Sequence, residues 1–327
     1  MKAAKSLIMV LALWMAASCA GKSTEQSDNQ NIVAQVSIIF DADSAYSFVA
    51  QQCVFGSRVP NSDAHKKCGN WLTDKLRSYG ASVTEQCADL KAYDGTVLHA
   101  RNIIGEFHKE KTERVLLIAH WDCRPWADND PDPNNHNVPV MGANDGASGV
   151  GVLIEIARVI STIDNPNVGI DILLVDAEDW GETGGNNENS WALGAQYWTA
   201  HPHRADYRRP TYGILLDMVG DENAAFLQEY YSRAYAPTVM DKIWKAAAEL
   251  GYSNRFINSH GGAVTDDHVV INRAGIPCID IIDQRKNSDT GFCEQWHTVD
   301  DQMSHISTET LKAVGQTIIY ALLEKQQ

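Results

Sequence analysis

Short apolar segments alternate with helical patterns along much of the chain, and this alternation constrains the fold most strongly. The segments 114–119, 168–176, 212–219 and 276–282 are rich in aliphatic residues at consecutive positions. A strand that is apolar at nearly every position buries both of its faces, which is typical of a sheet with helices on both sides. The sequence therefore predicts an α/β fold. The expected architecture is a three-layer sandwich, with a central mixed, largely parallel twisted sheet between two layers of helices.

The rest of the chain adds elements around this core. Residues 82–91 and 96–108 are expected to form edge strands. No internal repeat and no linker divides the body, so a single domain is expected at residues 36–327. Helices are expected at residues 43–56, 62–79, 147–160, 190–200, 236–250 and 308–324.

The N-terminal segment has the features of an export signal. Lys2 and Lys5 precede an apolar run and a group of small residues, so residues 1–18 are expected to be a signal peptide. Cys19 follows Ala-Ala-Ser, which resembles a relaxed lipobox. Cleavage before Cys19 and lipidation of its sulfur would leave a lipoprotein in which the polar residues 19–35 form a flexible tether. In the alternative, ordinary cleavage nearby leaves a soluble exported protein. In either case the expected location is outside the cytoplasm, periplasmic or tethered to a membrane.

Composition excludes some classes of partner. The chain has 327 residues, 44% of them hydrophobic, which is enough to bury a large core. Its formal net charge of -15 argues against nucleic acid and against an anionic membrane surface as partners. A monomer is favoured. The cysteines other than Cys19 are even in number, which permits disulfides in an exported protein without defining their pairing, and some could equally be buried apolar side chains. They are Cys53, Cys68, Cys87, Cys123, Cys278 and Cys293.

Polar clusters follow the expected strands at the points where the strands end. In open α/β sheets, ligands bind beyond the carboxyl ends of the parallel strands, so side chains at these positions come together. The turn at 144–149, which opens the helix expected at 147–160, contributes to the same edge. The polar residues at these positions are His120, Asp122, Asp145, Asp176, Glu178, Asp179, Asp217 and, after a loop, His297.

Each of these residues has a simple structural alternative when it is taken alone. Asp145 could cap a helix, and Asp217 could be a turn former. Glu178 and Asp179 could lie in a solvated loop, and His297 could be an ordinary loop histidine. Taken together, however, several carboxylates in one crevice would repel one another unless a cation neutralised them. Imidazole and carboxylate donors suit zinc, so the sequence predicts a zinc site.

The chain resembles the zinc aminopeptidase family and its relatives in the order and spacing of its motifs, over about residues 40–325. The matching motifs are His-x-Asp at 120–122, Asn-Asp-Gly-Ala-Ser-Gly at 144–149, Glu178-Asp179, Leu-Leu-Asp at 215–217 and His-Thr at 297–298. The resemblance implies the aminopeptidase-like α/β fold. It also implies that Glu178 matches the general base of the family, and that Asp179 departs conservatively from a pair that is more often Glu-Glu. In the aminopeptidases two zinc ions are bound, at the positions that correspond to His120, Asp145, Asp179, Asp217 and His297.

Three features resemble one branch of this family, the glutaminyl-peptide cyclotransferases. Trp296 directly precedes His297, and Asp-Asp-His stands at 266–268 where the peptidases often carry Ser-Asp-His. The insert at 124–139 and the motif Ala-Glu-Asp-Trp-Gly-Glu at 177–182 resemble bacterial exported cyclases of the animal-like type. The resemblance implies one zinc ion per chain, whose ligands would be Asp145, Asp179 and His297.

The same resemblance implies a reaction, the conversion of an N-terminal glutamine of a peptide or protein to pyroglutamate with release of ammonia. Zinc would act as the Lewis acid and Glu178 as the proton shuttle. Asp217 and Asp266 would form a hydrogen-bonded acid pair that helps proton transfer, and His120 would be a bystander. An apolar pocket for the glutamine side chain would be formed by Trp296, Trp191 and Phe292.

Several alternatives remain open from the sequence. Asp266 could be a helix cap, and Trp191 and Trp296 could be core residues. The loop at 128–135 has enough oxygen ligands for calcium, although Pro and Asn clusters more often build turns. The main alternative function is an exported aminopeptidase with two zinc ions, since all of its ligand positions are present. A non-enzymatic binding module would be expected to have lost the base or a ligand, and neither is lost.

Overall fold

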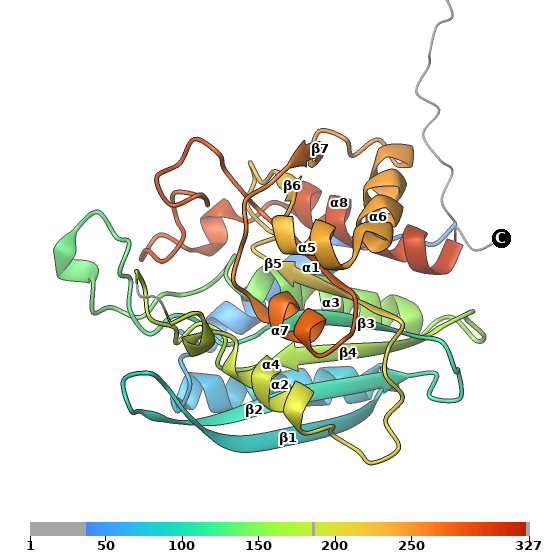
Figure 1. The fold of residues 1–327 in the computed structure, drawn as a ribbon, viewed down its shortest axis with the longest axis horizontal. Coiled ribbons are helices and arrows are strands. Elements are labelled where there is room, and N and C mark those ends of the chain that lie inside the picture. The colour runs from blue at the N-terminus through green and yellow to red at the C-terminus, as the bar shows by residue number, and fades with distance from the viewer. Residues whose placement is uncertain (1–36, 185–186, 325–327) are drawn as a thin grey trace, which may run out of the picture. The chain divides into compact units, whose positions relative to one another are not determined.

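The computed structural model describes residues 37–184 and 187–324, which belong to one compact unit (Figure 1). The strands are β1 Ser82–Lys91, β2 Val97–Phe107, β3 Arg114–His120, β4 Gly169–Val175, β5 Tyr212–Asp217, β6 Phe226–Gln228, β7 Phe256–His260 and β8 Cys278–Ile282. The α-helices are α1 Ala42–Val54, α2 Asp63–Ser78, α3 Ala147–Ile160, α4 Leu193–Ala200, α5 Tyr230–Tyr235, α6 Pro237–Glu249, α7 Asp267–Arg273 and α8 Thr308–Ile319. Short 3-10 turns lie at Pro133–Asn135, Glu188–Ser190 and Met303–His305, and a π-helical turn, Tyr320–Glu324, follows α8.

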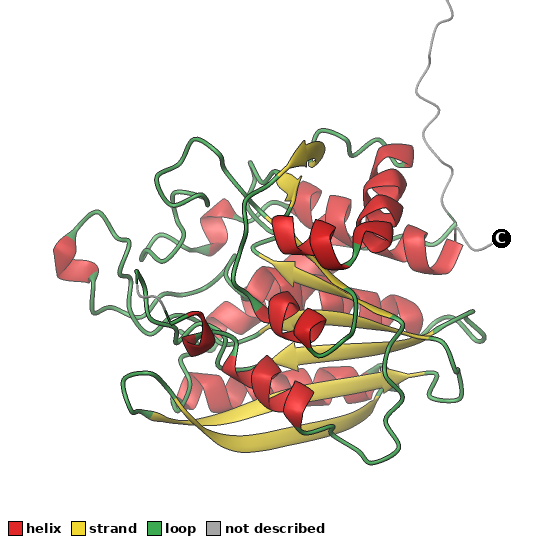
Figure 2. Cartoon of the chain, in the orientation of Figure 1, coloured by secondary structure: helices red, strands yellow, loops and turns green. Residues whose placement is uncertain are grey.

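The central sheet has six strands in the order β1-β2-β4-β3-β5-β8 (Figure 1), and Figure 2 shows helices on both sides of its strands. Strands β1 and β2 pair antiparallel at one edge, and β2 also pairs antiparallel with β4. The pairs β4-β3, β3-β5 and β5-β8 are parallel, so their carboxyl ends meet at the same edge. The predicted mixed, largely parallel sheet with helices on both faces is therefore confirmed.

Side chains that alternate along the central strands fill two separate cores. In β3, Leu117 packs into the large core under α1, α2, α3 and α8, while Leu116 packs into the smaller core under α4 and α7. In β4, Ile172 and Leu173 divide between the same two cores. Both faces of the parallel strands are buried, which is why these segments are apolar at almost every position.

The expected elements are observed with small shifts at their ends. The helix expected from 190 begins at Leu193, because residues 188–190 form a 3-10 turn and Ala192 has a left-handed backbone with φ 56°. Strand β5 stops at Asp217, since Met218 has φ 47° and leaves the extended conformation. The sequence patterns did not predict β6, β7, α5 or α7, although a helix after Asp266 was an alternative for that residue. These are short elements whose sequences have no clear period.

The signal peptide, the tether and Cys19 lie outside the described residues. The six other cysteines are free, so the sequence's allowance for disulfides is not realised among them. Within residues 37–184 and 187–324, no helix has both the length and the apolar character needed to cross a membrane.

Candidate active site

A cavity of about 230 Å³ opens at the carboxyl edge of the parallel strands. It is smaller than the usual range of sites for drug-sized ligands, so it suits a small group such as one amino-acid side chain. All nine site residues predicted from the sequence line it. They are Asp145, Glu178, Asp179, Trp191, Asp217, Asp266, Phe292, Trp296 and His297, joined by Met218, Ala263, Val264, Thr265 and Ile282.

The fold explains why residues so distant in sequence meet here. Asp217 ends β5, and the turn with Glu178 and Asp179 follows β4. Asp145 lies in the turn that leads into α3, and His297 lies in the long loop after β8. Parallel strands bring their carboxyl ends to one edge, and the loops that follow them form the crevice.

Asp145, Asp179 and His297 form a compact group whose donor atoms all lie within 4.8 Å of one another. The His297 Nε2 atom lies 3.2 Å from Asp179 Oδ1 and 3.6 Å from Asp145 Oδ2. Both carboxylate oxygens of Asp179 are buried without a hydrogen-bond partner. Burial opposes a charged imidazole, but the charge of Asp179 and the contact with Asp128 outweigh it and raise the pKa of His297 to about 9.

These observations fit a metal ion. The surrounding carboxylates favour positive charge at this point, and buried carboxylate oxygens without partners are costly unless a cation or a proton neutralises them. Two carboxylates and one imidazole suit zinc, and the family resemblance implied the same three ligands. Asp145, Asp179 and His297 are therefore the residues that can hold the metal.

A second group shares Asp145 with the first. His120 Nε2 lies 2.9 Å from Asp145 Oδ1 and 3.1 Å from Asp217 Oδ1, and these three side chains could also hold an ion. His120 is only 1% exposed. The positions that correspond to the two-zinc ligands of aminopeptidases are therefore all assembled.

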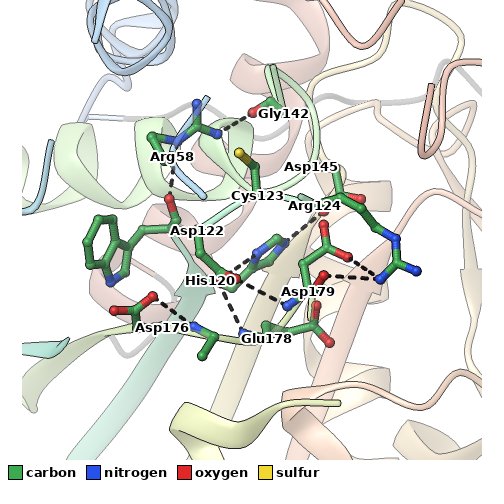
Figure 3. Close-up of polar contacts among 12 residues, drawn as sticks. Arg58, His120, Asp122, Cys123, Arg124, Gly142, Asp145, Asp176, Glu178 and Asp179 are labelled. Carbon is green, nitrogen blue, oxygen red and sulfur yellow. Dashed lines mark hydrogen bonds and ion pairs between the residues drawn. The ribbon is translucent and has the colours of Figure 1, made fainter. Parts of the chain in front are cut away.

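Glu178 faces the cavity beside the candidate metal ligands. The Asp122 carboxylate accepts hydrogen bonds from the backbone N–H groups of Glu178 and Asp179, each at 3.2 Å (Figure 3). Burial, reinforced by the charge of Asp266, raises the pKa of Glu178 well above its usual value. A carboxyl group with a raised pKa next to a reaction cavity is suited to both accept and donate a proton.

Asp217 and Asp266 line the same cavity from different elements. Burial and the charge of Asp145, with a smaller contribution from Asp266, raise the pKa of Asp217 to about 7. Asp266 is also the N-cap of α7 through Oδ1, as the structural alternative expected, while its Oδ2 is buried without a partner. The capping role therefore does not remove Asp266 from the site. The hydrogen bond expected between Asp217 and Asp266 stays a prediction.

An aromatic wall encloses the imidazole of His297. The Trp296 ring stacks on the His297 ring with centroids 3.9 Å apart, and Trp191 lies parallel to the same imidazole at 6.2 Å. Phe292 packs against Trp296 at 4.6 Å. These side chains face the cavity and are not plain core residues.

Left-handed backbone conformations concentrate at this site. Ala177, Met218 and His297 have φ values of 54°, 47° and 56°. Residues with a Cβ pay a conformational cost at such angles, and sites where this is tolerated are often functional. His297 in this conformation turns its ring toward the carboxylates.

Sequence reasoning missed the supporting roles of Asp122 and Asp301. Asp301 accepts hydrogen bonds from the N–H groups of Asn144 (2.7 Å) and Asp145 (3.1 Å). Asp122 belongs to the His-x-Asp motif, and Asp301 ends the segment Trp-His-Thr-Val-Asp-Asp at 296–301, so their positions beside site residues could have indicated them. From the sequence, the 128–135 loop could build a turn, bind calcium or shape the rim of the crevice, and no contact with a metal ligand was expected.

In the structure, acidic residues of the 128–135 loop have other partners. Asp128 binds Arg124, with Arg124 Nε 2.9 Å from Oδ1 and Nη2 2.6 Å from Oδ2. Asp130 and Asp132 accept hydrogen bonds within the loop, including those from the Asp132 and Asn134 N–H groups. Their hydrogen bonds are those of turn-building side chains.

Comparison with known proteins gives a family and several close structures. The model of peptidase family M28 matches residues 102–322. A glutaminyl cyclase of Bacteroides thetaiotaomicron, solved with bound N-acetylhistamine, is 52% identical with a TM-score of 0.84, and the match covers 88% of this chain and 99% of that one. A Zn-dependent exopeptidase of Parabacteroides distasonis is 51% identical with a TM-score of 0.86, covering 88% and 100%.

Curated relatives are more distant. Aminopeptidase YwaD of Bacillus subtilis is 28% identical over 253 residues, which is 75% of this chain and 49% of YwaD. The glutaminyl-peptide cyclotransferase of Bos taurus is 23% identical over 248 residues, 68% of this chain and 65% of the bovine protein. The matched region thus spans about half of YwaD and just under two thirds of the bovine protein. The activities of these relatives carry over to this chain only as a proposal.

Proposed function

The chain belongs to peptidase family M28, and from this premise we propose that it is a zinc-dependent glutaminyl-peptide cyclotransferase. The observation that carries the proposal is the 52% identity to a glutaminyl cyclase over 99% of that protein's length. The geometry supports it, because a small cavity with an aromatic wall places Glu178 beside a metal-ligand triad. The substrates are peptides or proteins that begin with glutamine.

The reaction needs no water. The N-terminal amine of the substrate attacks its own side-chain amide carbon, so that one C–N bond forms, the bond to the amide nitrogen breaks, and ammonia leaves. Asp145, Asp179 and His297 would hold one zinc ion, which would supply Lewis-acid chemistry for the amide carbonyl. Glu178 accepts a proton from the attacking amine and delivers it to the departing nitrogen.

The remaining cavity residues position the substrate and exclude solvent. Trp296, Trp191 and Phe292 form an apolar wall against which the glutamine side chain folds, which brings amine and amide together and excludes competing water. Asp217 at the end of β5 and Asp266 at the start of α7 orient the departing nitrogen. His120 holds Asp145 and Asp217 in place through contacts of 2.9 and 3.1 Å.

The test is product analysis with a glutamine-initiated dipeptide. A cyclotransferase yields a single product lighter by one ammonia, whereas an aminopeptidase yields two free amino acids. Glutamine β-naphthylamide gives the same discrimination, because the cyclase releases ammonia and the peptidase releases naphthylamine. Release of naphthylamine without ammonia would overturn the proposal.

The second candidate is an aminopeptidase with two zinc ions. The group of His120, Asp145 and Asp217 favours it, because these side chains lie close enough to hold a second ion. The metal content of the purified protein separates the candidates, since the cyclase is expected to bind one zinc ion per chain and the peptidase two.

Export of the protein is proposed on sequence grounds. The segment from residue 1 to Cys19 lies outside the described residues, and its pattern supports a lipid anchor at Cys19. Cys19→Ser is expected to move the protein from the membrane fraction to the soluble periplasmic fraction. If the parent protein is already soluble, ordinary cleavage is the correct alternative.

A further inference from the structure

Arg124 is fully buried beside the active site, and all three of its guanidinium nitrogens donate hydrogen bonds. Its Nη1 donates to the backbone carbonyl of Asp179 at 3.1 Å and lies 3.5 Å from Asp179 Oδ1 (Figure 3). The same nitrogen donates to the backbone carbonyl of Gly181 at 3.1 Å. Its Nε and Nη2 bind Asp128, and Nη2 also donates to Thr183 Oγ1. One buried side chain at the start of the insert 124–139 thus contacts both the loop after β4, which carries a metal ligand, and Asp128 within the insert.

Asp128 continues this connection to a second metal ligand. Its Oδ1 lies 3.5 Å from His297 Nδ1, while its Oδ2 accepts from Thr183 Oγ1 at 2.6 Å. The other nitrogen of the imidazole, Nε2, faces Asp179 and Asp145. Metal-binding histidines commonly present their second nitrogen to a carboxylate, which sets the tautomer and the orientation of the ring.

The same arginine also lies in a row of aromatic rings. Its guanidinium carbon is 5.0 Å from the Trp126 ring centre and 4.9 Å from that of Trp191. Trp191 in turn lies parallel to His297, which stacks on Trp296. A displacement of Arg124 would therefore reach both the metal ligands and the wall of the substrate cavity.

We propose that the Arg124–Asp128 pair positions the metal centre: Asp128 orients the imidazole of His297, and Arg124 holds Asp128, the Asp179 loop and Trp191 in register. The inference rests on the metal site of the proposed function and deepens it. Neither residue touches the reacting atoms, so both are positioning residues.

Replacing Arg124 can distinguish a charge effect from a positioning effect, because the two change the zinc affinity in opposite directions. Removing a positive charge next to a cation site would, by Coulomb's law alone, strengthen cation binding. Removing a group that holds two ligands in place should weaken it. Arg124→Met keeps an apolar side chain between Trp126 and Trp191, so the direction of the change in zinc affinity separates the two effects.

The experiment measures the zinc dissociation constant by competition with a chromophoric chelator, together with the absorption spectrum of the cobalt-substituted protein. Asp128→Asn and Arg124→Met are each expected to weaken zinc binding by about 10–100-fold, the usual effect of losing such a partner. Both variants should also alter the cobalt spectrum, because the ligand geometry changes. Asp132→Asn is the matched control, since it removes the same charge from the same loop but only releases Asn134.

Thr183→Val is a milder variant that still tests the proposal if Arg124→Met or Asp128→Asn fails to fold. Thr183 is exposed and contacts both members of the pair through its hydroxyl, so Thr183→Val should fold and weaken zinc binding in the same direction. Unchanged zinc affinity and an unchanged cobalt spectrum in the folded variants would overturn the proposal, as would tighter binding in Arg124→Met. These readouts do not depend on cyclase activity, so they stand even if the protein proves to be a peptidase.

Discussion

Buried carboxylates with structural roles hold the reactive side chains in place. Asp122 binds the backbone N–H groups of Glu178 and Asp179, and Asp301 binds the N–H group of Asp145. The turns that carry Asp145 and Asp179 are therefore each fixed by an acid that does not itself line the cavity. Such fixed turns keep catalytic groups within the small tolerances that proton transfer requires.

Replacing the single residue Glu178 tests its proposed role in proton transfer. Glu178→Gln keeps the size of the side chain and removes its ability to exchange a proton, so turnover should fall by about 10²–10⁴-fold. The zinc content should stay unchanged, because Glu178 is not among the metal ligands. Steady-state rates and metal analysis measure the two effects, and Glu182→Gln in the same loop is the control. Cyclisation by Glu178→Gln at close to the parent rate would show that another group moves the proton.

Close packing between α3 and β5 brings two parts of the site together. A Cβ added at Gly149 would collide with the carbonyl oxygen of Leu216, next to Asp217 at the end of β5. Helix α3 begins at Ala147, directly after the turn that contains Asp145. The glycine at 149 therefore lets the helix approach the strand closely enough for both acids to share His120.

Gly149→Ala tests this contact between elements. Helix propensity alone would make alanine more stable by about 1 kcal/mol. The collision with a backbone atom should reverse the sign and reduce the free energy of unfolding by about 1–3 kcal/mol. Denaturant unfolding of the metal-free protein measures the change. Gly262→Ala, where an added Cβ meets nothing within 4 Å, is the control, and equal stability of the two variants would contradict the packing argument.

Across the whole molecule, the candidate metal ligands join segments that are far apart in the chain. Asp145 precedes α3, Asp179 follows β4, and His297 lies in the loop after β8. A ligand that binds only the folded state stabilises it by mass action. Bound zinc should therefore stabilise the association of the central strands with the long C-terminal loop.

Removal of zinc by a chelator is expected to lower the midpoint of thermal unfolding. Asp145→Ala should show the lower midpoint already and should not respond to the chelator, because one of its ligands is missing. Calorimetry with and without chelator, together with metal analysis, tests this expectation. Stoichiometric zinc in purified Asp145→Ala would refute the assignment of Asp145 as a ligand.

The pairing of Glu106 with His203 and Arg204 should make the stability of the folded protein depend on pH in the acid range. Burial would raise the pKa of Glu106 in β2, but His203 and Arg204 outweigh it and hold the pKa at about 2. Because the folded pKa is depressed, the stabilisation is present above the unfolded value and is lost as pH falls from about 4.5 to about 2. Arg204 is partly exposed, so solvent screening limits the contribution to about 1 kcal/mol.

Unfolding of the parent and of Glu106→Gln, measured between neutral pH and pH 2, tests this contribution. The parent should lose its advantage over the variant as the pH falls through this window. A constant difference between the two proteins at all pH values would show that the pair does not titrate with folding.

Local pattern was sufficient for the fold class, most elements and the acids and histidines at the strand ends, while the aromatic cavity residues and the choice of metal ligands came from the family resemblance. Aliphatic runs bury both faces of a strand whatever their partners, and motif spacing places acids and histidines at strand ends, so both signals survive without coordinates. Tertiary contacts were needed for the strand order, the short β6–β7 pair, and the roles of Arg124 and Asp128. Read along the chain, Asp128 looks like a turn residue, because a buried ion pair acquires its meaning only from the groups that folding packs against it.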